Sequence, residues 1–422
     1  MPLARAIDPK NLTIHKNDLI NAINQLQAVQ PAGLNLRYFF NLALKFSFEH
    51  GQKTDTPQIA IVGLGIPEEL IYWAGAEPLW ILGGSFGAAL CADQLVPRDT
   101  DSVSKAAFGY LLSDVFAFTK NAALTVIPIA TDSMRKIAYL LSQEREVLAL
   151  DVPPVKDAPG SKHKWLAQMD RLCREIQKKT KKQLSASGLS DAITMVNQAK
   201  MQMKRILTYS MRSPEIISGV LALFLINTYY FTSNLPEWTL KLGALNDQIL
   251  GKIRARRGRS QKQRPRVMLA GSPVYFPNFK VPLLLQELDV YLSAYAQSMT
   301  QRIDLMPGTP RSGIRLQKVF ETIVLNHYGA DCSEAFVDSN NRYEYMKALA
   351  DGIQLNGVVY HVLKGQIEYD FELERCEQFF SRRGIPFFRL ETDYHQQDIE
   401  QLKIRLEAFM EMMEAKYYKM RA

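Results

Sequence analysis

The chain has 422 residues, of which 47% are hydrophobic and 22% are charged, with a formal net charge of +8 and a sequence pI near 9.1. This composition excludes an intrinsically disordered chain and is sufficient for two or three domains with buried cores. The positive charge is modest for the length, so it fits any anionic partner and does not by itself indicate nucleic acid.

Cysteine usage and apolar stretches indicate the compartment. The four cysteines are scattered and form no CxxC pair, which favours a reducing environment over a disulfide scaffold. The N-terminus has no apolar core of signal-peptide length, and the most apolar stretch, residues 216–231, is shorter than the roughly 20 residues that cross a bilayer. We therefore expect a cytoplasmic protein in which this stretch is a buried helix.

The first part of the chain predicts a helical segment followed by an α/β domain. Residues 1–55 carry apolar side chains at helical spacing, and residues 56–155 alternate strands with helices. A strand at 59–62 leads through a glycine turn into a helix begun by Pro67 and Glu68, as in a βαβ unit. Further strands are expected at 78–82, 125–130 and 147–151.

The second part predicts a helical insertion and another α/β domain. Residues 156–262 are almost wholly helical in pattern and end in an arginine-rich linker, and residues 263–422 return to alternating strands and helices with a C-terminal helix. Strands are expected at 266–274, 301–306, 356–362 and 386–391. The predicted fold class is α/β, with two doubly wound parallel-sheet domains.

Three blocks in the chain share one resemblance. They are GIPEELIYWAGAEPLWILGGS at 65–85, AGSPVYFPNFKVPLLLQELD at 270–289, and GIPFFRLETDYHQQDIEQLKIRLEAFMEMM at 384–413. In this order they resemble the subunits of the 2-hydroxyacyl-CoA dehydratase family, which includes benzoyl-CoA reductase subunits and the D-component of 2-hydroxyglutaryl-CoA dehydratase. The resemblance implies a subunit of a complex acting on an acyl-CoA thioester.

The resemblance also implies a four-iron, four-sulfur cluster held by three cysteine thiolates, because soft iron is matched to soft sulfur. The positions that match those cysteines carry Asp101, Thr131 and Gln366 here, and the family's Gly-Cys-Pro turn has Ser272 in place of its cysteine. A hydroxyl and an amide are poor substitutes for thiolates. We therefore expect no cluster in this chain, and predict no other cofactor.

A substrate cleft would be lined by residues in the matched blocks and beside the cluster positions. They are Gly65, Pro67, Glu68, Lys105, Ser272, Asn278, Lys280, Lys364, Glu391 and Asp393. Glycines at a helix start fit a CoA phosphate, and the end of a strand at the carboxyl edge of a sheet is where α/β proteins bind ligands. A tight βα turn, loop chemistry in the FPNFK segment and helix capping by Asp393 are the competing explanations.

Asp101 and Asp132 are the candidate acid–base groups for a reaction that needs no redox centre. A hard-metal pocket at Asp101, Thr131 and Gln366 is disfavoured, because only one of the three is a carboxylate. No histidine is paired with a cysteine or carboxylate at metal-ligand spacing, so no metal site is predicted. The basic run at 252–266 lacks interleaved aromatics, which favours a solvated linker over a nucleic-acid site.

Three functions remain open from the sequence. The first is a dehydratase-like subunit without its own cluster, which binds a paralogous subunit or a second copy of itself and helps to form an acyl-CoA cleft. The second is an enzyme of altered, non-redox chemistry on a CoA thioester or another small anion. The third is a scaffold or regulatory protein with no small ligand.

Overall fold

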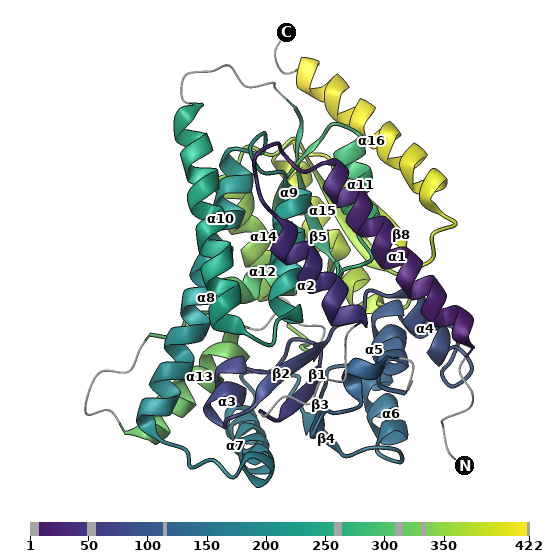
Figure 1. Ribbon diagram of the computed structural model, residues 1–422. Helices are drawn as coiled ribbons and strands as arrows, with labels where there is room; N and C mark the ends of the chain where they lie inside the picture. Colours follow the sequence, from purple (N-terminus) through teal and green to yellow (C-terminus); the bar gives the residue numbers. More distant parts are fainter. Residues whose placement is uncertain are drawn as a thin grey trace.

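The computed structural model describes residues 8–48, 56–112, 116–256, 264–308, 315–330, 335–338 and 340–419. Two parallel four-stranded sheets lie one above the other in Figure 1, and two long helices run along one side of both. These helices are α8 (Ala186–Arg212) and α10 (Leu235–Ala255). The predicted fold class, α/β with two parallel-sheet domains, is confirmed.

The first sheet has the strand order β2-β1-β3-β4, with all neighbours parallel. Its strands are β1 (Gln58–Val62), β2 (Glu77–Ile81), β3 (Leu124–Ile129) and β4 (Val147–Asp151). The connecting helices are α3 (Glu68–Trp73), α4 (Phe86–Ala92), α5 (Ser102–Leu112), η1 (Ala117–Thr119) and α6 (Asp132–Leu141).

The second sheet repeats the arrangement with the order β6-β5-β7-β8, again all parallel. Its strands are β5 (Arg266–Gly271), β6 (Tyr291–Ala296), β7 (Gly357–Leu363) and β8 (Phe387–Thr392). The helices of this domain are α11 (Lys280–Glu287), α12 (Ser298–Gln301), η3 (Arg302–Asp304), α13 (Leu316–Ala330), α14 (Asn340–Gly352), η4 (Ile367–Glu372), α15 (Leu373–Arg382) and α16 (Ile399–Lys419).

Both faces of the central strands of each sheet are buried, which explains their continuous apolar sequences. In β1, Ile59 and Ile61 join a central core, while Ala60 and Val62 join an outer core under α4, α5 and α6. In β5, alternate residues likewise divide between the central core and a second outer core. Because successive side chains of a strand point to opposite faces, each strand contributes to two cores. One face of each sheet packs into the same central core, which the two domains therefore share.

The helical region between the sheets supplies much of that central core. It contains α7 (Ser161–Thr180), α8, α9 (Gly219–Asn227), η2 (Thr228–Phe231) and α10. Every residue of α9 is buried, as expected for the apolar stretch in which it lies. Among the described residues, no helix combines the length and apolarity needed to cross a membrane.

Two N-terminal helices, α1 (Pro9–Ala28) and α2 (Arg37–Phe48), pack on the rest of the molecule. The α1 backbone approaches α4 closely at Gly87, where an added Cβ would lie 2.7 Å from the backbone nitrogen of His15. A glycine is therefore required at this helix crossing. The basic linker is only partly visible, because residues 257–263 lie outside the described residues.

The prediction of a strand at residues 301–306 is wrong. Residues 302–304 form the short helix η3, and the strand of this region is β6, ten residues earlier. All six residues of β6 are buried, and they include Ser293, Ala294 and Ala296, which have little intrinsic preference for strands. Burial between neighbouring helices and β5 decides this strand, so its own sequence gives a weak signal.

Candidate functional site

The carboxyl edges of the two sheets meet at the junction of the domains. The turn after β2 contacts the loop after β5, where the Asn278 backbone N–H donates to the Gly84 carbonyl at 3.1 Å. Gly84 has φ +88°, and a Cβ there would lie 2.6 Å from the Tyr275 carbonyl oxygen. Only glycine fits this approach, so the GGS turn that ends the first matched block is a contact between the domains.

A second contact joins the loop before α5 to the turn after β7. A Cβ on Gly365, which has φ +87°, would lie 2.9 Å from the Asp101 nitrogen. Tyr394, which follows β8, is buried with its hydroxyl oxygen 3.3 Å from the position of a Cβ on Gly83. The third matched block therefore places a tyrosine between the domains.

Two of the three residues predicted to match the cluster cysteines, Asp101 and Gln366, lie at this second contact. The Asp101 carboxylate accepts a hydrogen bond from the Ser104 N–H at 2.8 Å, which caps α5, and burial raises its pKa. Gln366 is also buried, and its side-chain oxygen has no hydrogen-bond partner. Thr131 caps α6 through the Met134 N–H at 3.2 Å, and the Asp132 side chain beside it is fully exposed.

The carboxyl edge of the second sheet carries a polar network. The buried ammonium of Lys280 donates to the His395 carbonyl and to the Asp398 carboxylate, each at 2.6 Å, and burial lowers the pKa of Lys280. Lys364 pairs with Asp393 at 3.1 Å. These contacts tie the start of α11 and the end of β7 to the loop after β8.

The remaining predicted residues of this region have local partners. The Ser272 hydroxyl accepts from the Leu363 N–H at 3.0 Å, and the Glu391 carboxylate pairs with Arg389 at 2.8 Å. Lys105 donates to the Arg98 carbonyl at 2.7 Å and pairs with Asp93 at 2.8 Å, which fixes the loop before α5. Each of these side chains therefore has a structural role at its position.

Glu68 lies in a buried charge cluster, defined here as Glu68, Glu69, Lys200 and Arg302. Both carboxylates are fully buried, and the Lys200 ammonium lies 3.3 Å from Glu68 and 3.1 Å from Glu69. Arg302 forms an ion pair with Glu68. Burial alone would raise the pKa of both glutamates, but Arg302 and Lys200 hold the Glu68 pKa below its usual value, and Lys200 with His327 lowers that of Glu69.

The buried charge cluster joins three parts of the chain. Glu68 and Glu69 begin α3, just after Gly65 and Pro67; Lys200 lies in α8; and Arg302 begins η3. Glu68 was predicted from the sequence as a site residue, but its two cations were not, because they lie in an ordinary amphipathic helix and in a segment expected to be a strand. A fully buried acidic pair requires counter-charges, which is the one signal that could have indicated them.

Two buried histidines were also missed as members of the domain junction. The His15 Nδ1 lies 2.8 Å from the Ser85 hydroxyl, and His361 Nδ1 lies 3.3 Å from the Ser272 carbonyl. Burial lowers the pKa of each imidazole to about 4, so both are neutral at physiological pH. These two histidines are distinguished by their neutral charge state, not by their spacing along the chain. A single sequence does not reveal this charge state.

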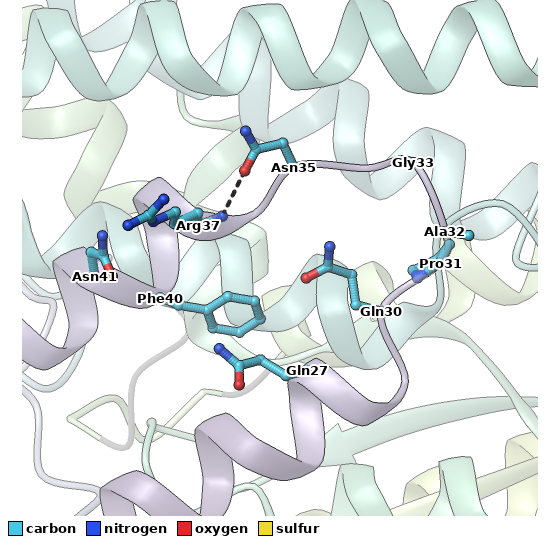
Figure 2. Close-up of a pocket in the computed structure, with 9 residues that line it drawn as sticks. All are labelled: Gln27, Gln30, Pro31, Ala32, Gly33, Asn35, Arg37, Phe40 and Asn41. Atoms are coloured by element: carbon cyan, nitrogen blue, oxygen red, sulfur yellow. Dashed lines mark hydrogen bonds between the residues drawn. The ribbon is translucent and has the colours of Figure 1, made fainter.

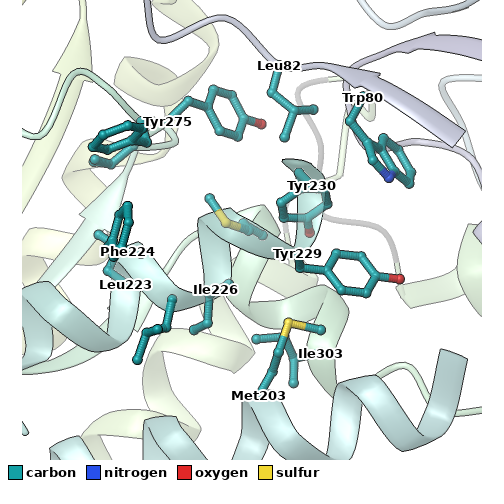
Figure 3. Packing of buried hydrophobic residues seen from close by; sticks show 14 of the residues in the cluster. Trp80, Leu82, Met203, Leu223, Phe224, Ile226, Tyr229, Tyr230, Tyr275 and Ile303 are labelled. Atoms are coloured by element: carbon teal, nitrogen blue, oxygen red, sulfur yellow. The ribbon is translucent and has the colours of Figure 1, made fainter. Parts of the chain in front are cut away.

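A small cavity of about 20 Å³ lies between the carboxyl edges. Its wall is aromatic and comes from several elements: Phe46, Trp80, Tyr110, Phe118, Tyr230, Phe231, Tyr275 and Phe276. Figure 3 shows Trp80, Tyr230 and Tyr275 in the central core beside this space. This space suffices for about one water molecule.

A larger pocket of about 370 Å³ lies on the surface between α1 and α2. Figure 2 shows the amides of Gln27, Gln30 and Asn35 around it, with the ring of Phe40 beside Gln27 and Gln30. The Arg37 N–H donates to the Asn35 side chain at 3.1 Å. None of the residues predicted as a substrate cleft lines this pocket.

The described cysteines do not gather at the cluster-equivalent positions. Cys91, Cys173 and Cys376 lie in α4, α7 and α15, and each is buried as a free thiol. Burial raises the pKa of each thiol, which disfavours the thiolate form that binds iron. Cys332 lies outside the described residues. Among the described residues, no group of three or more His, Cys, Asp or Glu side chains is arranged to hold a metal ion.

Comparison with known proteins identifies relatives over most of the chain. The Escherichia coli (strain K12) protein YjiM, provisionally named a dehydratase subunit, is 21% identical over 82% of this chain and 89% of its own length. The beta subunit of (R)-phenyllactyl-CoA dehydratase from Clostridium sporogenes is 19% identical over 87% of this chain and 95% of its own. Subunit beta of lactoyl-CoA dehydratase from Anaerotignum propionicum is 18% identical over 86% and 94%.

The family comparison covers the second sheet, the first sheet except β1, and the helices between them. The model of the 2-hydroxyglutaryl-CoA dehydratase D-component matches residues 64–413, so it begins at the turn after β1 and ends within α16. This range contains all three matched blocks and the buried charge cluster. The chain therefore belongs to the 2-hydroxyglutaryl-CoA dehydratase D-component family.

Proposed function

We propose that this chain is a dehydratase-type subunit that holds no iron–sulfur cluster of its own. It acts by assembling with a cysteine-bearing subunit of the same family, and its carboxyl edges form part of an acyl-CoA cleft in that complex. The observation that carries the proposal is the use of the cluster-equivalent positions. Asp101 and Thr131 cap helices, and Gln366 is a buried amide next to Gly365, whose backbone approaches Asp101.

The chemistry of these side chains supports the same conclusion. A four-iron cluster requires thiolates, whereas these positions offer one carboxyl, one hydroxyl and one amide. The pKa of the Asp101 carboxyl is raised by burial, which favours its neutral form and makes it a weaker ligand. The residues present therefore do not fit the cluster.

Anaerobic purification tests this part of the proposal. The tagged protein is purified without oxygen, and its iron, acid-labile sulfide and visible absorption are measured. We expect iron and sulfide far below one cluster per chain, both before and after incubation with ferrous iron and sulfide. Stoichiometric iron and sulfide with cluster absorption would overturn the proposal.

Assembly with a partner is supported by the names of the relatives and by an exposed apolar pair. Two of the relatives are named as beta subunits of acyl-CoA dehydratases. Immediately after Gln366, the short helix η4 exposes Ile367 by 62% and Phe371 by 84%. Two large apolar side chains this exposed on one short helix are typical of a protein contact.

Co-expression tests the assembly. The chain is produced with cysteine-bearing family members from the same genome, and the mass of each complex is measured by light scattering after gel filtration. We expect a stable complex that Phe371→Glu weakens and Leu240→Glu does not, because Leu240 is also exposed, by 74%, but lies on α10. Failure to bind any such subunit, or equal effects of the two variants, would count against this assembly.

A further inference from the structure

Arg302 connects the second domain to the turn that follows β1 in the first. It begins η3, its guanidinium is almost wholly buried, and its two terminal nitrogens donate to the carbonyl oxygens of Leu64 and Ile66. These carbonyls belong to the turn between β1 and α3. A residue more than 230 positions away in sequence therefore fixes the backbone of this turn.

The same guanidinium also contacts the neighbouring strand. It lies over the ring of Trp80 in β2, 5.2 Å from the ring centroid, which is within range of a cation–π interaction. Trp80 in turn lines the small aromatic cavity at the domain junction. Arg302 thus fixes the ends of two adjacent strands at the edge where α/β sheets bind ligands.

The rest of the buried charge cluster holds Arg302 in place. Glu68 accepts from Arg302 and from the Tyr229 hydroxyl, the latter at 3.0 Å. Lys200 supplies the second cation beside Glu68 and Glu69, so two carboxylates are balanced by two cations. A buried guanidinium without such partners would be strongly destabilising.

We infer that Arg302 is a positioning residue, which from the second domain sets the conformation of residues 63–67 at the ligand edge of the first sheet. The planar fork of arginine is required for this role, because it reaches two carbonyls and a carboxylate at once. The importance of this edge for an acyl-CoA rests on the proposed function. The control of the turn by Arg302 does not depend on it.

A purely stabilising role for Arg302 gives a different result from a positioning role. Loss of stability alone raises opening throughout the protein, whereas loss of positioning loosens the turn after β1 while other buried backbone stays protected. Hydrogen–deuterium exchange of the whole chain, followed by peptide mass spectrometry, separates these outcomes. The informative peptides cover residues 58–73, and peptides covering β5 and β7 are the reference.

The variants are Arg302→Lys, which keeps the charge but not the fork, and Arg302→Met. The matched control is Arg342→Met: Arg342 is also buried, pairs with Glu372 at 3.0 Å and lies over the Tyr369 ring at 4.3 Å, all within the second domain. If Arg302→Met does not fold, Arg302→Lys still decides the test.

We expect Arg302→Lys to accelerate amide exchange in residues 63–66 by about tenfold or more relative to β5 and β7, because charge-assisted hydrogen bonds are lost. Arg342→Met should leave the ratio of the exchange rate in this turn to the exchange rates in β5 and β7 unchanged. An unchanged ratio in Arg302→Lys, or an equal rise in Arg342→Met, would overturn the inference.

A calorimetric titration with coenzyme A and butyryl-CoA adds a second readout. It uses the chain in its complex with the cysteine-bearing subunit. If the wild-type complex binds either probe, Arg302→Lys should weaken binding more than Arg342→Met does, and equal weakening would argue against positioning. If the wild-type complex binds neither, the acyl-CoA part of the proposed function fails, while the exchange result still decides the role of Arg302.

Discussion

Replacing Lys200 by methionine tests the buried charge cluster most directly. The Lys200 side chain is 1% exposed, and its ammonium lies 3.1 Å from Glu69, 3.3 Å from Glu68 and 2.9 Å from the Leu305 carbonyl. Methionine retains most of the volume but leaves a carboxylate without a counter-charge in the protein interior. Removing one partner of a buried ion pair typically costs about 3–5 kcal/mol.

Thermal unfolding measures this loss. An unfolding entropy of roughly 2 cal/mol/K per residue means that about 1 kcal/mol moves the midpoint of a chain this long by about 1 °C when it unfolds as one unit. We therefore expect Lys200→Met to lower the midpoint by about 3–6 °C. Lys204→Met is the matched control, because this lysine is one turn further along α8 and pairs with Asp304 at the surface. The Lys204 side chain is 56% exposed. An exposed pair contributes about 0–1 kcal/mol, so the control should change little.

A compensating variant distinguishes charge imbalance from lost packing. Lys200→Met combined with Glu69→Gln restores neutrality in the cluster, so the double variant should be more stable than Lys200→Met alone. A Lys200→Met midpoint within about 1 °C of the wild type would refute the reasoning. So would a double variant whose midpoint falls by the sum of the decreases measured for Lys200→Met and Glu69→Gln separately.

Three further predictions address the domain junction. The pKa values of His15 and His361 are lowered to about 4 in the folded protein from 6.5, so each contributes stability that is complete above pH 6.5 and is lost as the pH falls toward 4, on the order of 3 kcal/mol per histidine. His361→Gln should therefore flatten the fall of the thermal midpoint over this range; an unchanged pH profile would contradict the burial argument. Asp101→Ala should cost about 1 kcal/mol in chemical denaturation by removing the cap of α5, and Asp101→Asn, which can still cap, should cost less; loss of ligand binding in Asp101→Asn with unchanged stability would instead favour an acid–base role. Gly365→Ala should cost about 1–3 kcal/mol in the same assay, because its positive φ and the nearby Asp101 backbone disfavour a side chain, and a neutral effect would show that the turn adapts.

The sequence by itself determined the architecture and the family. Apolar runs such as residues 59–62, closed by glycine turns and followed by helices, predict parallel strands because burial on both faces leaves no polar alternation. The prediction that Asp101, Thr131 and Gln366 match the family's cluster cysteines likewise rests on the spacing of neighbouring residues. Local patterns and linear spacing are properties that a single chain displays directly.

Only the tertiary structure decided how the edges of the two domains are joined. The pairing of Glu68 with Arg302 and Lys200 joins residues more than 100 positions apart, and the sequence assigned Arg302 to a strand. The neutral state of His15 and His361 likewise depends on burial by distant segments. Charge compensation and desolvation arise from neighbours in space, so they become visible only when the folded chain brings those neighbours together.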